Sequence, residues 1–116
     1  MRMRGVAVIC ICLLALTVHA LADISDFKVN ENGEKNWHIN AHIATDDLGN
    51  FVVIWRNGVE HESDVYLQRY DKEGRKIANN VMVTSSRSGT FQEGISVSMD
   101  AQGNFIVAWI NFVDGL

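Results

Sequence analysis

One phrase of seven residues occurs twice in this 116-residue chain, and it constrains the fold more than any other feature. Gly49 to Trp55 reads GNFVVIW and Gly103 to Trp109 reads GNFIVAW, so five of the seven residues are identical at an offset of 54, which we call the repeat offset. At the same offset, WHINAHIATDDLGNFVVIW from Trp37 aligns without a gap with FQEGISVSMDAQGNFIVAW from Phe91. Self-similarity with a period of roughly 20 to 50 residues is typical of propellers, solenoids and arrays, so we expect a repeat architecture.

The local patterns predict that the repeat is built of strands. The segment 37–45 alternates apolar and polar residues, with the apolar side formed by Trp37, Ile39, Ala41 and Ile43. Its counterpart has an apolar side formed by Phe91, Ile95, Val97 and Met99. This period of two is typical of a half-buried strand. The segments 51–55 and 105–110 are apolar on both faces and rich in β-branched and aromatic residues, which predicts strands covered from both sides.

Turns of one chemical type separate these strands. Each begins with Asp and ends with Gly three positions later, at Asp46–Gly49, Asp71–Gly74 and Asp100–Gly103. An Asp side chain accepts backbone N–H bonds from residues just after it, and Gly supplies the positive φ that closes a hairpin with a bulge. Hairpins join antiparallel neighbours, so one unit is predicted to contain four antiparallel strands near 37–45, 50–57, 64–70 and 75–84. Residues 58–63 form the longer loop.

The N-terminus has the layout of a secretory signal. A short basic head carries Arg2 and Arg4, an apolar run follows from Val6 to Val18, and Ala20-Leu21-Ala22 offers small side chains for cleavage after Ala22. The alternative, an uncleaved membrane anchor, requires about 20 apolar residues, more than this run contains. We therefore expect a helical signal peptide over 1–22, export to the periplasm, cell surface or medium, and no membrane span after cleavage.

Charge and cysteine content narrow the function classes. Cys10 and Cys12 are the only cysteines and both fall in the predicted signal, so the mature chain is expected to lack disulfides and thiol chemistry. Loss of Arg2 and Arg4 changes the formal net charge from −4 to −6. An acidic chain without a basic patch is a poor partner for nucleic acid.

Four antiparallel strands, with a second strand buried on both faces, are what a β-propeller blade requires, since neighbouring blades cover it. FKVN at 27–30 aligns with VMVT at 81–84, again at the repeat offset. We therefore divide the mature chain into a lead-in (23–36) that holds the tail of a preceding repeat (27–30), one complete repeat (37–90), and the first half of the next repeat (91–116).

The run DVYLQRYDKEG at 64–74, with GNFVVIW before it and a VMVT-type strand after it, resembles a tandem repeat of large secreted and surface proteins of bacteria. Those repeats follow the pattern GNFVVxW, DIYxQRYDxxG and FKVN. The resemblance implies β-propeller-like domains in several copies, mostly without an assigned activity.

A closed propeller has roughly four to eight blades. The expected architecture is therefore an incomplete propeller; a small sandwich of two sheets and an assembly of copies are the alternatives. An open blade exposes a strand edge, which favours self-association.

None of the residue types associated with catalysis or metal binding forms a convincing set. His38 and His42 would stand about 13 Å apart on a strand, and His61 with Glu60 and Glu62 adds no recognisable ligand set. Calcium needs six to eight oxygen ligands, more than Asp46, Asp47 and Asn50 supply. The segment from Thr45 to Gly49 matches only the first part of the Asp-box of sialidase-type propellers, because Val52 stands where that motif has an aromatic residue. Ser85, Ser86 and Ser88 have no oriented base.

The aromatic side chains are interpreted as packing groups. Trp55 and Trp109 recur at the repeat offset, and Trp37 is matched by Phe91, which favours packing between blades over a carbohydrate platform. Arg69, Tyr66 and Tyr70 are interpreted as blade-packing and edge groups. The positions assigned a structural role in the repeat are Asp46, Gly49, Trp55, Asp71, Gly74, Asp100, Gly103 and Trp109.

The sequence thus predicts a non-enzymatic secreted or surface-displayed module that binds a protein or glycan and uses no cofactor. The alternative is a fragment of a propeller enzyme, such as a glycosidase or lyase, whose catalytic residues lie on missing blades.

Overall fold

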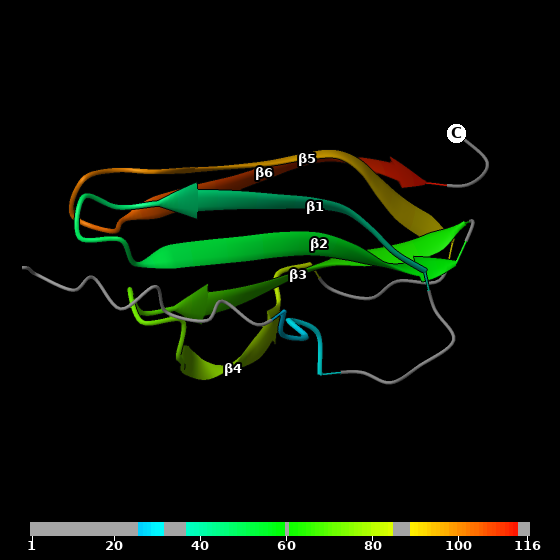
Figure 1. The fold of residues 1–116 in the computed structure, drawn as a ribbon. Coiled ribbons are helices and arrows are strands. Elements are labelled where there is room, and N and C mark those ends of the chain that lie inside the picture. Colours follow the sequence, from blue (N-terminus) through cyan, green and yellow to red (C-terminus); the bar gives the residue numbers. More distant parts are fainter. Residues whose placement is uncertain (1–25, 32–36, 60, 85–88, 114–116) are drawn as a thin grey trace, which may run out of the picture.

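The computed structural model describes residues 26–31, 37–59, 61–84 and 89–113. These residues form strands and no helix, and therefore no helix able to cross a membrane (Figure 1). The strands are β1 (Trp37–Thr45), β2 (Phe51–Val59), β3 (Glu62–Tyr70), β4 (Lys76–Met82), β5 (Thr90–Met99) and β6 (Phe105–Val113). The first sheet has the order β1-β2-β3-β4, the second sheet pairs β5 with β6, and every pair is antiparallel.

The prediction of an all-β chain with a four-stranded antiparallel sheet is confirmed, with strand bounds that agree to within two residues. The signal segment 1–22, its cleavage after Ala22, and the serines at 85, 86 and 88 lie outside the described residues.

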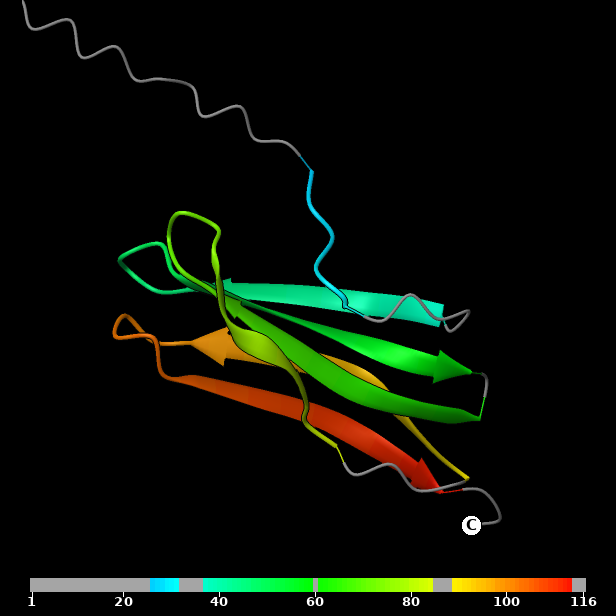
Figure 2. The ribbon, with the colours of Figure 1, turned by 90° about the horizontal axis from the view of Figure 1, so that it is seen from below.

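The second sheet lies over one face of the first sheet, and the core fills the space between them (Figures 1 and 2). We call this side of each sheet its inner face. The buried residues of the core are Val52, Ile54, Val65, Leu67 and Ile95, and the partly buried residues of the second sheet that pack on them are Val97, Met99, Phe105 and Val107. Burial of these apolar side chains is the main force that holds the two sheets together.

The path of β5 across the first sheet is fixed by hydrogen bonds at both of its ends. Near its start, the Gln92 N–H donates to Ser63 Oγ at 3.1 Å, which places it at the beginning of β3. Just beyond its end, the Asp47 N–H donates to the carbonyl of Ala101 at 3.3 Å, which joins the turn after β1 to the turn after β5.

Stacked aromatic rings line the other face of the first sheet, which we call its outer face. The Phe51 and Tyr70 rings stack with centroids 4.8 Å apart, and Trp55 stacks on Tyr66 at 6.0 Å. Phe27 adds a tilted contact with Tyr70 at 5.3 Å. Residues 26–31, which include FKVN, run beside β4 without joining the sheet, held by the Lys76 ammonium 3.1 Å from the Glu31 carboxylate.

The prediction that Trp37, Ile39 and Ile43 share one side of β1 is wrong. Ile39 is opposite Arg56 and His42 is opposite Ile54, so two residues of β1 lie across from one residue of β2. Such a bulge interrupts the alternation of side chains. Trp37 and Ile39 therefore lie on the inner face and Ile43 on the outer face. The same shift occurs in β5 between Glu93 and Ser96. Phe91 therefore lies on the other face of the second sheet from Val97 and Met99.

The prediction of burial on both sides is right for β2 and wrong for β6. Val52, Ile54 and Trp55 of β2 are all buried. In β6, by contrast, Ile106 is 74% exposed and Ile110 is 56% exposed, because no described residue covers the side of β6 that faces away from the first sheet. Trp55 and Trp109 were both expected to pack between blades; Trp55 is buried on the outer face, where it stacks on Tyr66, whereas Trp109 keeps 37% of its surface exposed.

Gln68 compensates for an irregularity in β4. The pairing of β3 with β4 shifts between Leu67 and Arg69, and Ala78 adopts a φ of 61°. The fully buried Gln68 amide donates to the carbonyls of Arg69 and Ala78, both at 2.9 Å, and accepts from Asn80 Nδ2 at 2.6 Å. Its side chain thus replaces the ladder bonds that the irregular backbone lacks.

Candidate functional site

The turn between β1 and β2 is organised by the carboxylate of Asp46. Its Oδ1 accepts the backbone N–H groups of Leu48 and Asn50, each at 2.9 Å. The Asp46 N–H donates to the Asn50 carbonyl at 2.9 Å, and the Gly49 N–H donates to the Asp46 carbonyl at 3.2 Å. Gly49 has a φ of 88°, which side-chain-bearing residues rarely adopt.

The turns at Asp71 and Asp100 have the same hydrogen bonds. Asp71 Oδ1 accepts the N–H of Glu73 at 3.0 Å and of Arg75 at 2.9 Å, and Asp100 Oδ1 accepts the N–H of Gln102 at 3.0 Å and of Asn104 at 2.9 Å. Positive φ values recur at Gly74 and Gly103.

The fifth residue of each turn also binds the Asp, and sequence reasoning missed it. Asn50 Nδ2 donates to Asp46 Oδ2 at 2.8 Å, and Asn104 Nδ2 donates to Asp100 Oδ2 at 2.8 Å. In the middle turn, Arg75 Nε donates to Asp71 Oδ2 at 2.7 Å. The signal was present in the sequence, because Asn recurs after the Gly at the repeat offset.

These bonds favour the ionised form of each Asp. The Asn50 amide is the main cause of the lowered pKa of Asp46, and the Asn104 amide has the same effect on Asp100. The backbone N–H of Arg75 is the main cause of the lowered pKa of Asp71, and the Asp71 carboxylate in turn raises the pKa of Arg75. The three carboxylates are therefore committed to closing turns and are poor candidates for acid–base chemistry.

All three turns meet at one end of the molecule (Figure 1). The Lys72 N–H donates to Asn50 Oδ1 at 3.1 Å, which ties the middle turn to the first. The bond from Asp47 to Ala101 ties the first turn to the third. We call this end of the molecule the turn end.

A hollow of about 170 Å³ lies at the turn end and is lined by residues of the first sheet, of β5 and of the first and third turns. Its lining combines polar and apolar residues: Asp46, Asn50, Phe51, Arg69, Tyr70, Ile77, Met99, Gln102 and Gly103. Asp46 and Asn50 are engaged in turn bonds, whereas the side chains of Arg69 and Gln102 have no hydrogen-bond partner among the described residues. Arg69 is exposed, so its guanidinium is free to bind a ligand. Sequence reasoning treated Arg69 as a packing group and did not single out Gln102.

The histidines do not come together. His38 pairs with Asn57 on the outer face of the first sheet, while His42 pairs with Ile54 on its inner face. His61 contacts the edge of Phe91, with ring centroids 6.2 Å apart. In the part of the chain that the structure describes, no three His, Cys, Asp or Glu side chains are grouped in a way that would hold a metal ion.

A buried polar cluster at the opposite end links the sheets. Arg56 Nη1 donates to the Gln92 carbonyl at 2.7 Å, and Gln92 Nε2 donates to Asn111 Oδ1 at 2.9 Å. Gln92 is 1% exposed, so these bonds satisfy groups that water cannot reach. Two buried atoms lack a partner among the described residues, Asn57 Oδ1 and the Tyr70 hydroxyl. Burial, and then the charge of Glu31, raises the pKa of Tyr70.

Comparison of the chain with models of protein families, with curated proteins and with solved structures finds no match.

Proposed function

We propose that the protein is an exported β-propeller-like repeat module, a non-enzymatic scaffold that binds a glycan in the hollow at the turn end. The observation that carries this proposal is the agreement of backbone geometry at the repeat offset. β2 spans 51–59 and β6 spans 105–113, so both bounds differ by that offset. The bulges of β1 and β5 are separated by the same offset.

The unusual backbone angles follow the repeat offset as well. Asn40 and Gly94 both have a φ of 56°, and Gly49 and Gly103 have φ values of 88° and 89°. Positive φ is rare outside Gly, Asn and Asp, so its recurrence at matched positions is unexpected for two unrelated sheets. This supports two copies of one structural unit.

The stacking of the sheets supports the propeller-like interpretation. Phe105 and Val107 of the second sheet pack toward Val52 of the first sheet. Their counterparts one repeat offset earlier, Phe51 and Val53, lie on the opposite side of the first sheet from Val52, because neighbours along a strand face opposite ways. The two units therefore pack outer face to inner face, in the same orientation, as successive propeller blades do.

A glycan fits the hollow better than a larger ligand does. Its volume of about 170 Å³ is below the roughly 300–1,000 Å³ of pockets for drug-sized molecules, so it holds one sugar residue and not an extended ligand. Arg69 supplies a planar set of donors that matches a carboxylate, and Gln102 supplies both a donor and an acceptor. Met99 and Ile77 supply apolar surface. The best-matched ligand is therefore a sugar that carries a carboxylate.

The test is calorimetric titration of the protein with uronic-acid oligosaccharides and with neutral hexose oligosaccharides of equal length. We expect binding of the acidic sugars alone. Arg69→Ala removes a charge-assisted hydrogen bond worth about 1.5–3 kcal/mol, so affinity falls by roughly 10- to 100-fold.

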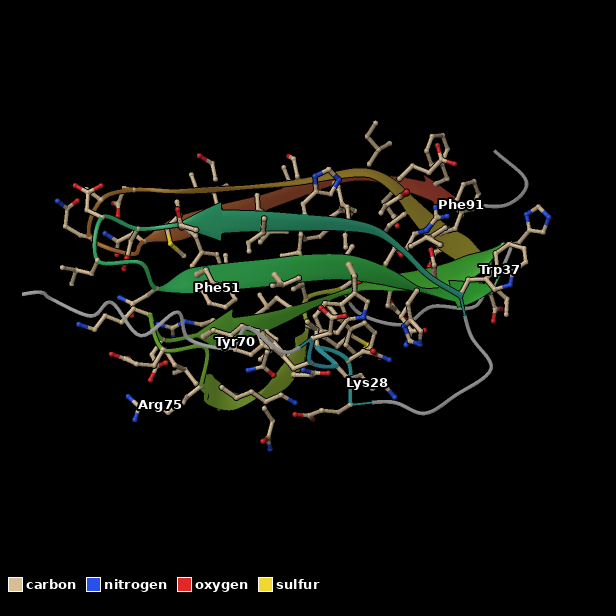
Figure 3. All side chains as sticks on the ribbon, in the orientation of Figure 1. Lys28, Trp37, Phe51, Tyr70, Arg75 and Phe91 are labelled. Atoms are coloured by element: carbon tan, nitrogen blue, oxygen red, sulfur yellow. The ribbon has the colours of Figure 1, made fainter. Side chains whose placement is uncertain are left out.

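Lys28→Ala is the matched control, because it removes one positive charge from an exposed residue that does not line the hollow (Figure 3). Its affinity should equal that of the wild-type chain. Equal weakening by both substitutions would indicate a general charge effect, and unchanged binding by Arg69→Ala would place the ligand elsewhere. Either result contradicts the proposed site.

A further inference from the structure

The side of the second sheet that faces away from the first sheet has no described strand over it (Figures 1 and 2), and it carries exposed apolar side chains of β6. We call it the open face. Its β6 residues are Ile106, which is 74% exposed, the exposed Ala108, and Ile110, which is 56% exposed. The β5 residues that pair with them are polar: Ser98 with Ile106, Ser96 with Ala108, and Glu93 with Ile110. Apolar side chains in a row on a flat sheet are typical of an interaction surface.

The first sheet shows what covers this kind of face. The residues one repeat offset before Ile106 and Ala108 are Val52 and Ile54, and both are 0% exposed. They are buried by the inner face of the second sheet, which includes Val97, Phe105 and Val107. Ile106 and Ala108 therefore occupy the same repeat positions as two residues that, in this same chain, are completely buried by a neighbouring sheet.

The chain also carries the matching half of that interface. The counterparts of Val97, Phe105 and Val107 are Ile43, Phe51 and Val53, on the outer face of the first sheet. Of these, Ile43 is 60% exposed, and Phe51 and Val53 are half-buried. Residues 26–31 contact Asn80 and Lys76 of β4 and Tyr70 of β3, which lie on the side of the first sheet away from β1.

We propose that a second copy of this chain docks on the open face through the patch around its own Ile43. This contact continues between copies the sheet-on-sheet interface seen within one chain, and it rests on the proposed repeat architecture. The two contacting surfaces differ, so the contact is heterologous and produces rings or open arrays instead of a closed two-fold dimer.

Sedimentation velocity over a range of concentrations tests the proposal. The full coding sequence is expressed, so that the N-terminus is processed as in the natural protein. The wild-type chain should form species larger than the monomer whose share grows with concentration. Ile106→Glu places a charge in the proposed contact and should weaken association on the order of 100-fold. Ile43→Glu should have the same effect from the other side.

Leu48→Glu is the matched control, because Leu48 is 73% exposed and lies in a turn, outside both surfaces. It should assemble as the wild-type chain does. Far-UV circular dichroism establishes that each variant is folded, and Ile110→Ser provides a second, milder change on the open face if Ile106→Glu does not fold.

Mixing the two interface variants distinguishes this arrangement from a two-fold dimer. The Ile43→Glu variant keeps its open face and the Ile106→Glu variant keeps its Ile43 patch, so an equimolar mixture retains one wild-type contact and should form a discrete heterodimer. If open faces instead paired with each other, Ile43→Glu would assemble like the wild-type chain and the mixture would contain no heterodimer.

A wild-type chain that stays monomeric at all concentrations, or a mixture that stays monomeric, overturns the proposal. Failure of the proposed assembly can be distinguished from failure of the proposed glycan binding. Arg69→Ala should leave assembly unchanged, and Ile106→Glu should leave the affinity for uronic-acid oligosaccharides unchanged.

Discussion

Replacing the glycine of each turn by alanine separates backbone strain from packing. Gly74 and Gly103 have φ values of 78° and 89°, so alanine is strained at both positions. A Cβ at Gly74 would meet nothing within 4 Å, whereas a Cβ at Gly103 would lie 3.1 Å from Asp46 Oδ2. Both substitutions therefore strain the backbone, but only Gly103→Ala also brings the new Cβ against the Asp46 side chain.

The magnitudes follow from these two causes. Left-handed backbone costs a non-glycine residue about 1–2 kcal/mol, which is the expected loss for Gly74→Ala. In Gly103→Ala, the Asp46 oxygen must also move although Asn50 Nδ2 holds it at 2.8 Å. Weakening that hydrogen bond adds about 1 kcal/mol. For a domain of this size, each kcal/mol corresponds to roughly 4–8 °C in Tm.

The assay is urea unfolding followed by tryptophan fluorescence, with the free energy of unfolding compared among the wild-type chain and the two variants. Gly49→Ala is an internal control, because its Cβ would make an ordinary contact of 3.4 Å with Lys72 and its loss should resemble that of Gly74→Ala. Equal losses for Gly103→Ala and Gly74→Ala would refute the packing of the third turn against the first.

Two further predictions concern polar groups. Because the folded pKa values of Asp46, Asp71 and Asp100 lie below the unfolded value of about 3.9, their stabilising contribution is complete above about pH 4 and is lost as the pH falls through the folded values. In the Asp46→Asn variant, the urea concentration at half unfolding should therefore fall less steeply as the pH drops below 4. An unchanged pH dependence would contradict the stabilising role of the ionised Asp46. Gln68→Leu leaves buried carbonyls without donors and should lower the free energy of unfolding by about 1–3 kcal/mol, whereas the exposed Gln102→Leu should change it by less than about 0.5 kcal/mol. Similar losses for both would show that the Gln68 network contributes little.

The strands and turns could be predicted because they depend on local chemistry. Alternating residues, β-branched runs and the Asp-to-Gly turns each act over a few positions, and the antiparallel order follows from the hairpins. The bulges were not predicted from the alternation of residues. A single extra residue in a strand moves every side chain beyond it to the other face, so the predicted faces were wrong. A signal did exist: Asn40 and Gly94 occupy matched positions, and both residue types tolerate positive φ.

The uncovered side of β6 and the hollow could not be predicted from the sequence, because both depend on the tertiary structure. Ile106 and Val52 have similar local sequences, yet one is 74% and the other 0% exposed, because burial depends on whether a neighbouring sheet is present. Arg69 lies in β3 and Gln102 lies in the turn between β5 and β6, far apart in the sequence, and only the meeting of the turns brings them to one hollow. The periodicity of the sequence does not predict which distant residues meet in space.

Methyl NOE spectroscopy of the Ile43→Glu variant tests most directly whether the two units stack in the same orientation, because this variant removes interference from assembly. Ile95 shares one buried cluster with Val52, Ile54, Val65 and Leu67, so its methyl groups should give NOEs to methyl groups of that cluster, whereas Ile106 should give none to any methyl group of β2 or β3. NOEs between Ile106 and Ile54 would mean that the second sheet presents its opposite face to the first, which would contradict the proposed stacking of the two units.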